Sequence, residues 1–247
     1  MREHDRRLNR PGNQPGEPIW WDRGYHPHFE SQHHIQHICV HLADSLPRHV
    51  VDSWAEELRS APPSMRDVEK QRRVNAYLDA GHGDCMLREP EVASMVQESL
   101  LHFAGTRYVL HGWCIMPNHV HILLQPAHGI TMSTSMASWK KYTGRRISAW
   151  RQKERGLPPG PVWHREYFDR FIRDEAHYRN VVAYIHDNPV NAGLVDRPEK
   201  WMWSSAGVAS VLEDPEGLTL PAFPDRTGVR RTPELEVMNN TVIVLAE

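Results

Sequence analysis

The chain has 247 residues, 40% of them hydrophobic, and a formal net charge of −2, which allows one sizeable domain with additional segments. It has no run of about 18 apolar residues, which argues against a membrane span, and its near-neutral charge argues against a uniformly basic nucleic-acid-binding protein. The three cysteines, Cys39, Cys85 and Cys114, form no CxxC pair and predict free thiols in a reducing cytoplasm.

Composition divides the chain into three parts. Residues 1–33 are rich in Pro, Gly, Arg and His and predict a flexible basic arm. Residues 34–210 carry the clear helix and strand patterns and are expected to form one domain. Residues 211–247 have weak periodicity and indicate a C-terminal extension whose role the sequence does not assign.

The first half of the central part predicts one strand followed by helices. Polar and apolar residues alternate over 33–44, which indicates a strand. An amphipathic pattern over 48–61 indicates a helix, and 62–87 forms a connector with partial helical character. A further helix is expected over 88–105, because Pro90 lies in its first turn and Gly105 lies past its end.

The second half predicts a β-hairpin and two more helices. The strands would be residues 108–115 and 119–125, joined by the turn "MPN". A basic helix is expected over 131–153, residues 165–172 are strand-like or irregular, and a helix over 174–188 should end before Pro189. This order predicts an α+β fold, in which helices pack on an antiparallel sheet.

Two histidines, His119 and His121, lie one residue apart in the otherwise apolar run "MPNHVHILL". On a strand both would point to the same face with Cβ atoms about 7 Å apart, so they could converge on one metal ion. Val120 would point to the core and leave the histidine face free. Because the chain has 17 histidines, the spacing alone also allows an incidental pair that is exposed or satisfied by other contacts.

A basic strip, "WKKYTGRRISAWRQKER", occupies the predicted helix over 131–153 and the residues just after it. Such helices often only face solvent. Its cations, interleaved with Trp139, Tyr142 and Trp150, would also suit a single DNA strand, with phosphates on the cations and bases on the rings. The candidate DNA-binding residues are Lys140, Lys141, Arg145, Arg146, Arg165, Arg170 and Arg173.

Three longer motifs occur in order along the chain: "WCIMPNHVHILLQP", "EYFDRFIRDEAHYRNVVAYIHDNPVNAGLV" and "WMWSSA". Together they resemble the REP-associated tyrosine transposases, within the HUH group of single-strand DNA nucleases. The segments "HICVHLADSLPRH" and "YLDAGHGDCMLREPEVASMV" are similar to the N-terminal half of that family. The resemblance extends from about residue 34 to residue 206 and implies a ferredoxin-like or RRM-like HUH fold.

The resemblance implies that His119 and His121 bind a metal, that Tyr184 is the nucleophile and that Asn188 completes the metal site. Tyr184 and Asn188 are four residues apart and would share a helix face. An amide oxygen beside two imidazoles suits Mg²⁺ or Mn²⁺. Taken without the family, Tyr184 could be an ordinary core aromatic and Asn188 a helix C-cap.

The implied activity is the nicking and rejoining of single-stranded or hairpin, REP-like DNA through a 5′-phosphotyrosine intermediate. The implied location is the cytoplasm, with the DNA of the bacterial nucleoid, and no membrane partner is expected. Monomer and homodimer both stay open. The alternatives are a non-catalytic nucleic-acid-binding protein on the same fold, a metal-dependent phosphodiesterase that uses water, and a structural protein with incidental histidines.

Overall fold

The computed structural model describes residues 6–7, 19–22, 27–31 and 34–212. Its centre is an antiparallel sheet of β4 (Gln36–His41), β5 (Tyr108–Ile115), β6 (His119–Pro126) and β7 (Phe168–Phe171). The strand order is β5-β6-β4-β7, with helices between β4 and β5 and between β6 and β7. This order and chain path are those of a ferredoxin-like βαββαβ unit, so the predicted α+β class is confirmed.

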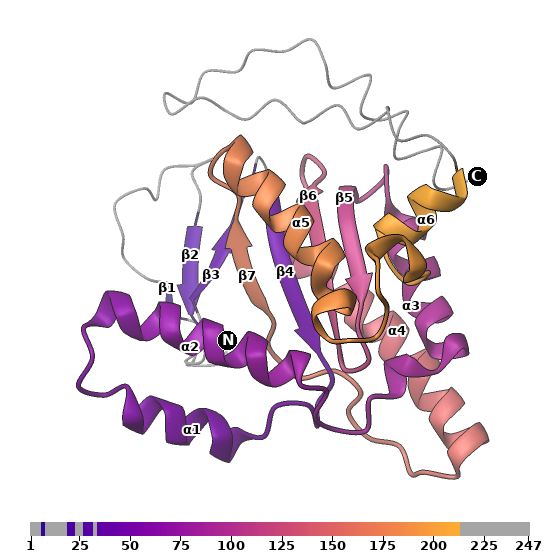
Figure 1. The fold of residues 1–247 in the computed structure, drawn as a ribbon, viewed down its shortest axis with the longest axis horizontal. Coiled ribbons are helices and arrows are strands. Elements are labelled where there is room, and N and C mark those ends of the chain that lie inside the picture. The colour runs from indigo at the N-terminus through magenta and orange to yellow at the C-terminus, as the bar shows by residue number, and fades with distance from the viewer. Residues whose placement is uncertain (1–5, 8–18, 23–26, 32–33, 213–247) are drawn as a thin grey trace.

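Helices cover both faces of this sheet (Figure 1). On one face, α3 (Pro90–Phe103) and α4 (Met132–Arg155) enclose the main core, to which Val40, Val120 and Ile122 contribute fully buried side chains. On the other face lies α5 (Glu175–Asn191). Because side chains alternate along a strand, His119 and His121 point away from the main core and towards the α5 side.

The segment after β4 is more helical than the sequence indicates. After α1 (Arg48–Glu57), α2 (Pro63–Asp79) spans most of the predicted connector. Pro63 opens α2 at a position where a missing N–H costs nothing, and Val74 and Leu78 are buried against Val51 of α1. The remaining short helices are η1 (Met86–Arg88), η2 (Pro198–Lys200) and α6 (Ser205–Leu212).

The predicted end of α5 before Pro189 is wrong, because the helix continues to Asn191. Proline lacks only one donor, and so close to the helix end this removes a single intrahelical hydrogen bond. The chain then turns at Gly193, which has a φ of +68°. Asn188 is consequently an internal residue of the helix, and the C-cap is Ala192.

Parts of the predicted flexible arm form a second sheet with order β1-β2-β3, made of β1 (Arg6–Arg7), β2 (Ile19–Asp22) and β3 (Pro27–Glu30). These three short strands are regular structure that the sequence does not predict, while the flexibility of the arm stays a prediction. Their position depends on His28, which is buried between Asp169 and Glu166 of the central domain, and a partner about 140 residues away is not visible in a local pattern. The division at residues 33 and 210 stays a prediction, and residues 213–247 lie outside the described part.

No helix among the described residues is long and apolar enough to span a membrane.

Candidate active site

His119 and His121 project from β6 into the layer beneath α5, and each is only 1% exposed. Their Nε2 atoms lie 3.0 Å apart, with the two rings nearly perpendicular. Two ligand atoms that bind one ion at about 2.1 Å and at a right angle are separated by about 3 Å, so this spacing suits a shared metal. The histidine face, expected to be free, is instead enclosed by α5 and the end of α2.

The other ring nitrogen of each histidine already has a partner. His119 Nδ1 lies 2.7 Å from Asn118 Oδ1, and the Asn118 amide is oriented by its own donation to the carbonyl of His82. His121 Nδ1 lies 3.1 Å from Nε2 of His37. Because Asn118 Oδ1 can only accept, His119 carries its proton on Nδ1 and keeps a lone pair on Nε2.

Electrostatics keep these rings neutral. Burial, reinforced by the neighbouring histidine His37, lowers the pKa of His119 to about 3. Burial with the proximity of His119 and His37 lowers the pKa of His121 well below its usual value. Neutral imidazole is the form that binds a metal. The pair is therefore in the ligating protonation state at neutral pH.

Asp79, the last residue of α2, is a further candidate ligand that no sequence motif indicates. Its Oδ1 lies 3.4 Å from Nε2 of His119, and the ligand atoms of Asp79, His119 and His121 all lie within 4.8 Å of one another. Burial raises the pKa of Asp79 to about 6, while the Asn188 amide opposes this shift. A carboxylate beside two imidazoles is a suitable donor set for a divalent cation.

Tyr184 and Asn188 complete the cluster from α5. The Tyr184 ring lies edge-on to His121, with ring centroids 5.2 Å apart, and Nδ2 of Asn188 lies 3.2 Å from His121 Nε2. The Tyr184 hydroxyl, Asn188 Oδ1 and Asp79 Oδ1 are buried oxygens without a hydrogen-bond partner among the described residues. Since buried polar atoms are normally paired, unpaired oxygens gathered around two imidazoles suit a metal or a substrate.

The environment of Tyr184 favours the protonated form of its hydroxyl. Burial, with the nearby carboxylate of Asp79, raises the pKa of Tyr184 above its usual range, and Asn188 opposes the shift. A phenolate at this position therefore needs added positive charge. Two neighbours on α5 point elsewhere, since Tyr178 faces His111 and His186 bonds Ser205.

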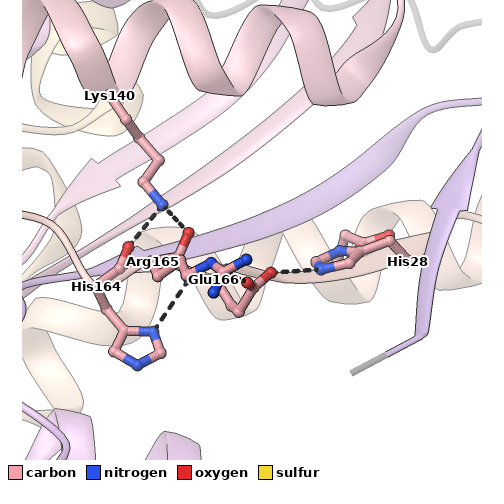
Figure 2. Close-up of polar contacts among 6 residues, drawn as sticks. His28, Lys140, His164, Arg165 and Glu166 are labelled. Atoms are coloured by element: carbon pink, nitrogen blue, oxygen red, sulfur yellow. Dashed lines mark hydrogen bonds and ion pairs between the residues drawn. The ribbon is translucent and has the colours of Figure 1, made fainter. Parts of the chain in front are cut away.

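The predicted basic residues on α4 do not act as one group. Lys140 donates to the backbone carbonyls of His164 and Arg165 at 2.6 and 2.7 Å, so its charge is used within the fold (Figure 2). Arg146 Nη1 lies 3.4 Å from a carboxylate oxygen of Glu98. Lys141 and Arg145 line an open hollow of about 430 Å³. Arg165 lines it as well, while its Nε lies 3.3 Å from a carboxylate oxygen of Glu166.

The last two predicted cations lie on the side of the sheet that carries the histidines. Arg170 is the register partner of His37 across β4 and β7, and strand partners share a face. Arg173 follows β7 and, like Arg170, lowers the pKa of His177, although burial is the larger cause. Both arginines are exposed, which places accessible positive charge at this edge of the candidate site.

Comparisons with known proteins point to one family. The family model described as "Transposase IS200 like" matches residues 88–188. A presumed REP-associated tyrosine transposase of Haemophilus influenzae is 31% identical over 100 residues, which make up 37% of this chain and 55% of the relative. The chain thus aligns with about half the length of that relative.

A solved structure of a REP-associated tyrosine transposase bound to a REP hairpin is 15% identical in sequence, with a TM-score of 0.47. The match covers 85% of this chain and 99% of that one. The segment matched by the family model contains His119, His121, Tyr184 and Asn188. The resemblance to this transposase family that the motifs predict is therefore confirmed over residues 88–188.

Proposed function

We propose that this protein is a metal-dependent tyrosine transposase or endonuclease that nicks and rejoins single-stranded or hairpin, REP-like DNA. The observation that carries the proposal is the position of Tyr184, whose ring lies 5.2 Å from that of His121. Its buried hydroxyl lies in the same cluster as Asn188 and Asp79. A core aromatic would not need a polar cluster of this kind around its hydroxyl.

In this mechanism the Tyr184 oxygen attacks the phosphorus of one DNA phosphodiester. A bond forms between that oxygen and phosphorus, the bond from phosphorus to the 3′-oxygen breaks, and the phenol proton is lost while the leaving oxygen gains one. The products are a 5′-phosphotyrosine and a free 3′-hydroxyl. Attack by another 3′-hydroxyl reverses the step and joins strands without an external energy source.

The residues that would hold the metal are His119, His121 and Asn188, with Asp79 as a fourth candidate. The unpaired oxygens of Asn188 and Asp79 and the two Nε2 atoms fit such a group. A half-turn of the Asn188 amide would present its oxygen, rather than its nitrogen, to this cluster. When bound, Mg²⁺ or Mn²⁺ would neutralise charge on the phosphate and favour the tyrosine phenolate.

The proposed partner is DNA. Lys141, Arg145 and Arg165 on one side and Arg170 and Arg173 on the other are the candidate phosphate contacts. All catalytic and ligand candidates come from a single chain, so the proposal does not require exchange of α5 between subunits. A substrate of this kind would place the protein with chromosomal DNA in the cytoplasm.

The activity can be tested with end-labelled single-stranded hairpin DNA, taken from repeats near the gene and incubated with the protein and Mn²⁺ or Mg²⁺. The proposal predicts nicking of the single strand that stops when EDTA is added, with a 3′-hydroxyl on the released fragment. The fully paired duplex is the matched control substrate. A 3′-phosphate product, or equal cleavage in EDTA, would contradict it.

A further inference from the structure

An open hollow of about 430 Å³ lies between α4 and the segment 160–165. Lys141 and Arg145 face it from α4, and Arg165 faces it from the opposite wall. None of the described residues that line the hollow is acidic. Lys141 and Arg145 are exposed and form no ion pair within the described chain, so their charges are available to a ligand.

The walls of the hollow are fixed by internal hydrogen bonds. Lys140 holds the carbonyls of His164 and Arg165 on one side (Figure 2). The buried Trp163 donates from its indole nitrogen to Thr143 of α4 at 2.9 Å. The segment that carries Arg165 is therefore tied to the helix that carries Lys141 and Arg145, and binding a ligand there needs little reordering.

The chemistry of the hollow fits a sugar-phosphate backbone. Lys141 and Arg145 are one helical turn apart, about 6 Å between Cβ atoms, a spacing similar to that of successive phosphates in a strand. Trp163, whose indole lines the hollow, is 7% exposed and offers no open ring face for a base. The exposed ring of Tyr142 lies beside Arg146, and neither residue lines the hollow.

The segment that forms one wall of the hollow packs beside β4, the strand next to the one that carries the HVH pair. His164, which lines the hollow, stacks on His41 with ring centroids 4.4 Å apart. His41 is the register partner of His119 across β4 and β6. The wall of the hollow and the strand that carries the HVH pair are therefore joined within the fold by buried side chains.

We propose that this hollow binds successive phosphates of the DNA strand independently of base sequence. Lys141, Arg145 and Arg165 would contact the phosphates. Lys140 stabilises the segment 160–165 through its hydrogen bonds, and Arg146 lies outside the site. The inference rests on the proposed function for the identity of the ligand as DNA. Of the cations in the basic strip, Lys141 and Arg145 would thus contact the DNA backbone, whereas Lys140 stabilises the fold.

The test measures binding of fluorescent single-stranded and hairpin DNA to the full-length protein in EDTA, by anisotropy over a series of salt concentrations. For the double variant Lys141→Gln, Arg145→Gln we expect at least tenfold weaker binding at low salt. The log–log salt slope should fall by about 1.4, since each single-strand phosphate contact contributes about 0.7. Arg146→Gln, the matched control, should bind within about twofold of wild type.

Two outcomes would overturn the inference: an unchanged salt slope in the double variant, or a loss of affinity confined to one base sequence. Arg165→Gln tests the opposite wall separately, and thermal melting checks that each variant is folded. If wild type binds with the expected slope but never cleaves DNA, the proposed activity fails while the hollow stands. If wild type cleaves DNA and the double variant keeps wild-type affinity and slope, the hollow alone fails.

Discussion

His37 Nε2 lies 3.1 Å from Nδ1 of His121, the ring nitrogen that faces away from His119. For His121 to offer the lone pair of Nε2 to a metal, its proton must be on Nδ1, and His37 is then the acceptor. His37 itself is neutral, because burial, with the nearby His177 and Arg170, lowers its pKa to about 4. It is thus a positioning residue for the candidate metal site.

Replacing His37 should weaken metal binding without removing a ligand. We expect His37→Ala to lower Mn²⁺ affinity by roughly 10- to 100-fold, the usual effect of losing such an outer partner, as measured by titration calorimetry. His37→Gln retains a side-chain oxygen that can accept the proton of His121, so its affinity should fall less. Equal affinity in wild type and His37→Ala would refute the role.

Removal of either histidine of the candidate metal site should abolish specific metal binding. His119→Ala and His121→Ala each delete one of the two Nε2 atoms that lie 3.0 Å apart, so we expect bound Mn²⁺ to disappear from electron paramagnetic resonance titrations. His102→Ala is the control, since His102 is exposed on α3. Tight stoichiometric Mn²⁺ binding by His119→Ala would place the metal elsewhere.

Asp79→Asn tests the further candidate ligand, whose Oδ1 lies 3.4 Å from Nε2 of His119. The substitution keeps the size of the side chain but removes the negative charge beside His119, so Mn²⁺ affinity should drop by about tenfold or more. Asp52→Asn, at an exposed position on α1, should leave the affinity unchanged. If Asp79→Asn binds Mn²⁺ with wild-type affinity, Asp79 is not a metal ligand and only lies near the site.

We expect the free energy of unfolding to depend on pH through His28. Burial alone would lower the pKa of His28, but hydrogen bonds to Asp169 and Glu166 raise it to about 9. Because the folded pKa exceeds the unfolded value, this stabilisation is complete below about pH 6.5 and is lost as pH rises through 9. It amounts to at most about 3 kcal/mol.

Urea unfolding of wild type at pH 6 and at pH 9.5 measures this effect. Relative to wild type, His28→Gln should be much less stable at pH 6 and nearly equal at pH 9.5. His49→Gln, at an exposed position on α1, controls for the loss of a histidine. A His28→Gln protein with the same pH profile as wild type would show that the ion pair does not hold the β2–β3 hairpin.

Local patterns predicted most of the central fold. The β-branched and aromatic content of residues 108–115 and 119–125, with the turn "MPN" between them, places the hairpin correctly. The four-residue spacing likewise predicts that Tyr184 and Asn188 share a face of α5, and the structure directs both towards His121. These features depend on local composition and residue spacing, which a sequence carries directly.

Long-range contacts could not be predicted in this way. Asp79 is the last residue of a polar helix, and nothing local shows that the end of α2 meets β6. Lys140 and Lys141 are adjacent in one basic strip, yet they have different roles. Lys140 donates hydrogen bonds to backbone carbonyls, whereas Lys141 lines the hollow. Such distinctions depend on which element packs alongside, and that is decided by tertiary structure.

The central claim is that Tyr184 is the nucleophile, and it is tested most directly by trapping the covalent protein–DNA adduct on a denaturing gel with hairpin DNA and Mn²⁺. We expect the adduct with wild type and with Tyr178→Phe, whose hydroxyl faces His111 on the same helix, and none with Tyr184→Phe. An adduct or cleavage by Tyr184→Phe at the wild-type level would contradict the account and favour water or another residue as the nucleophile.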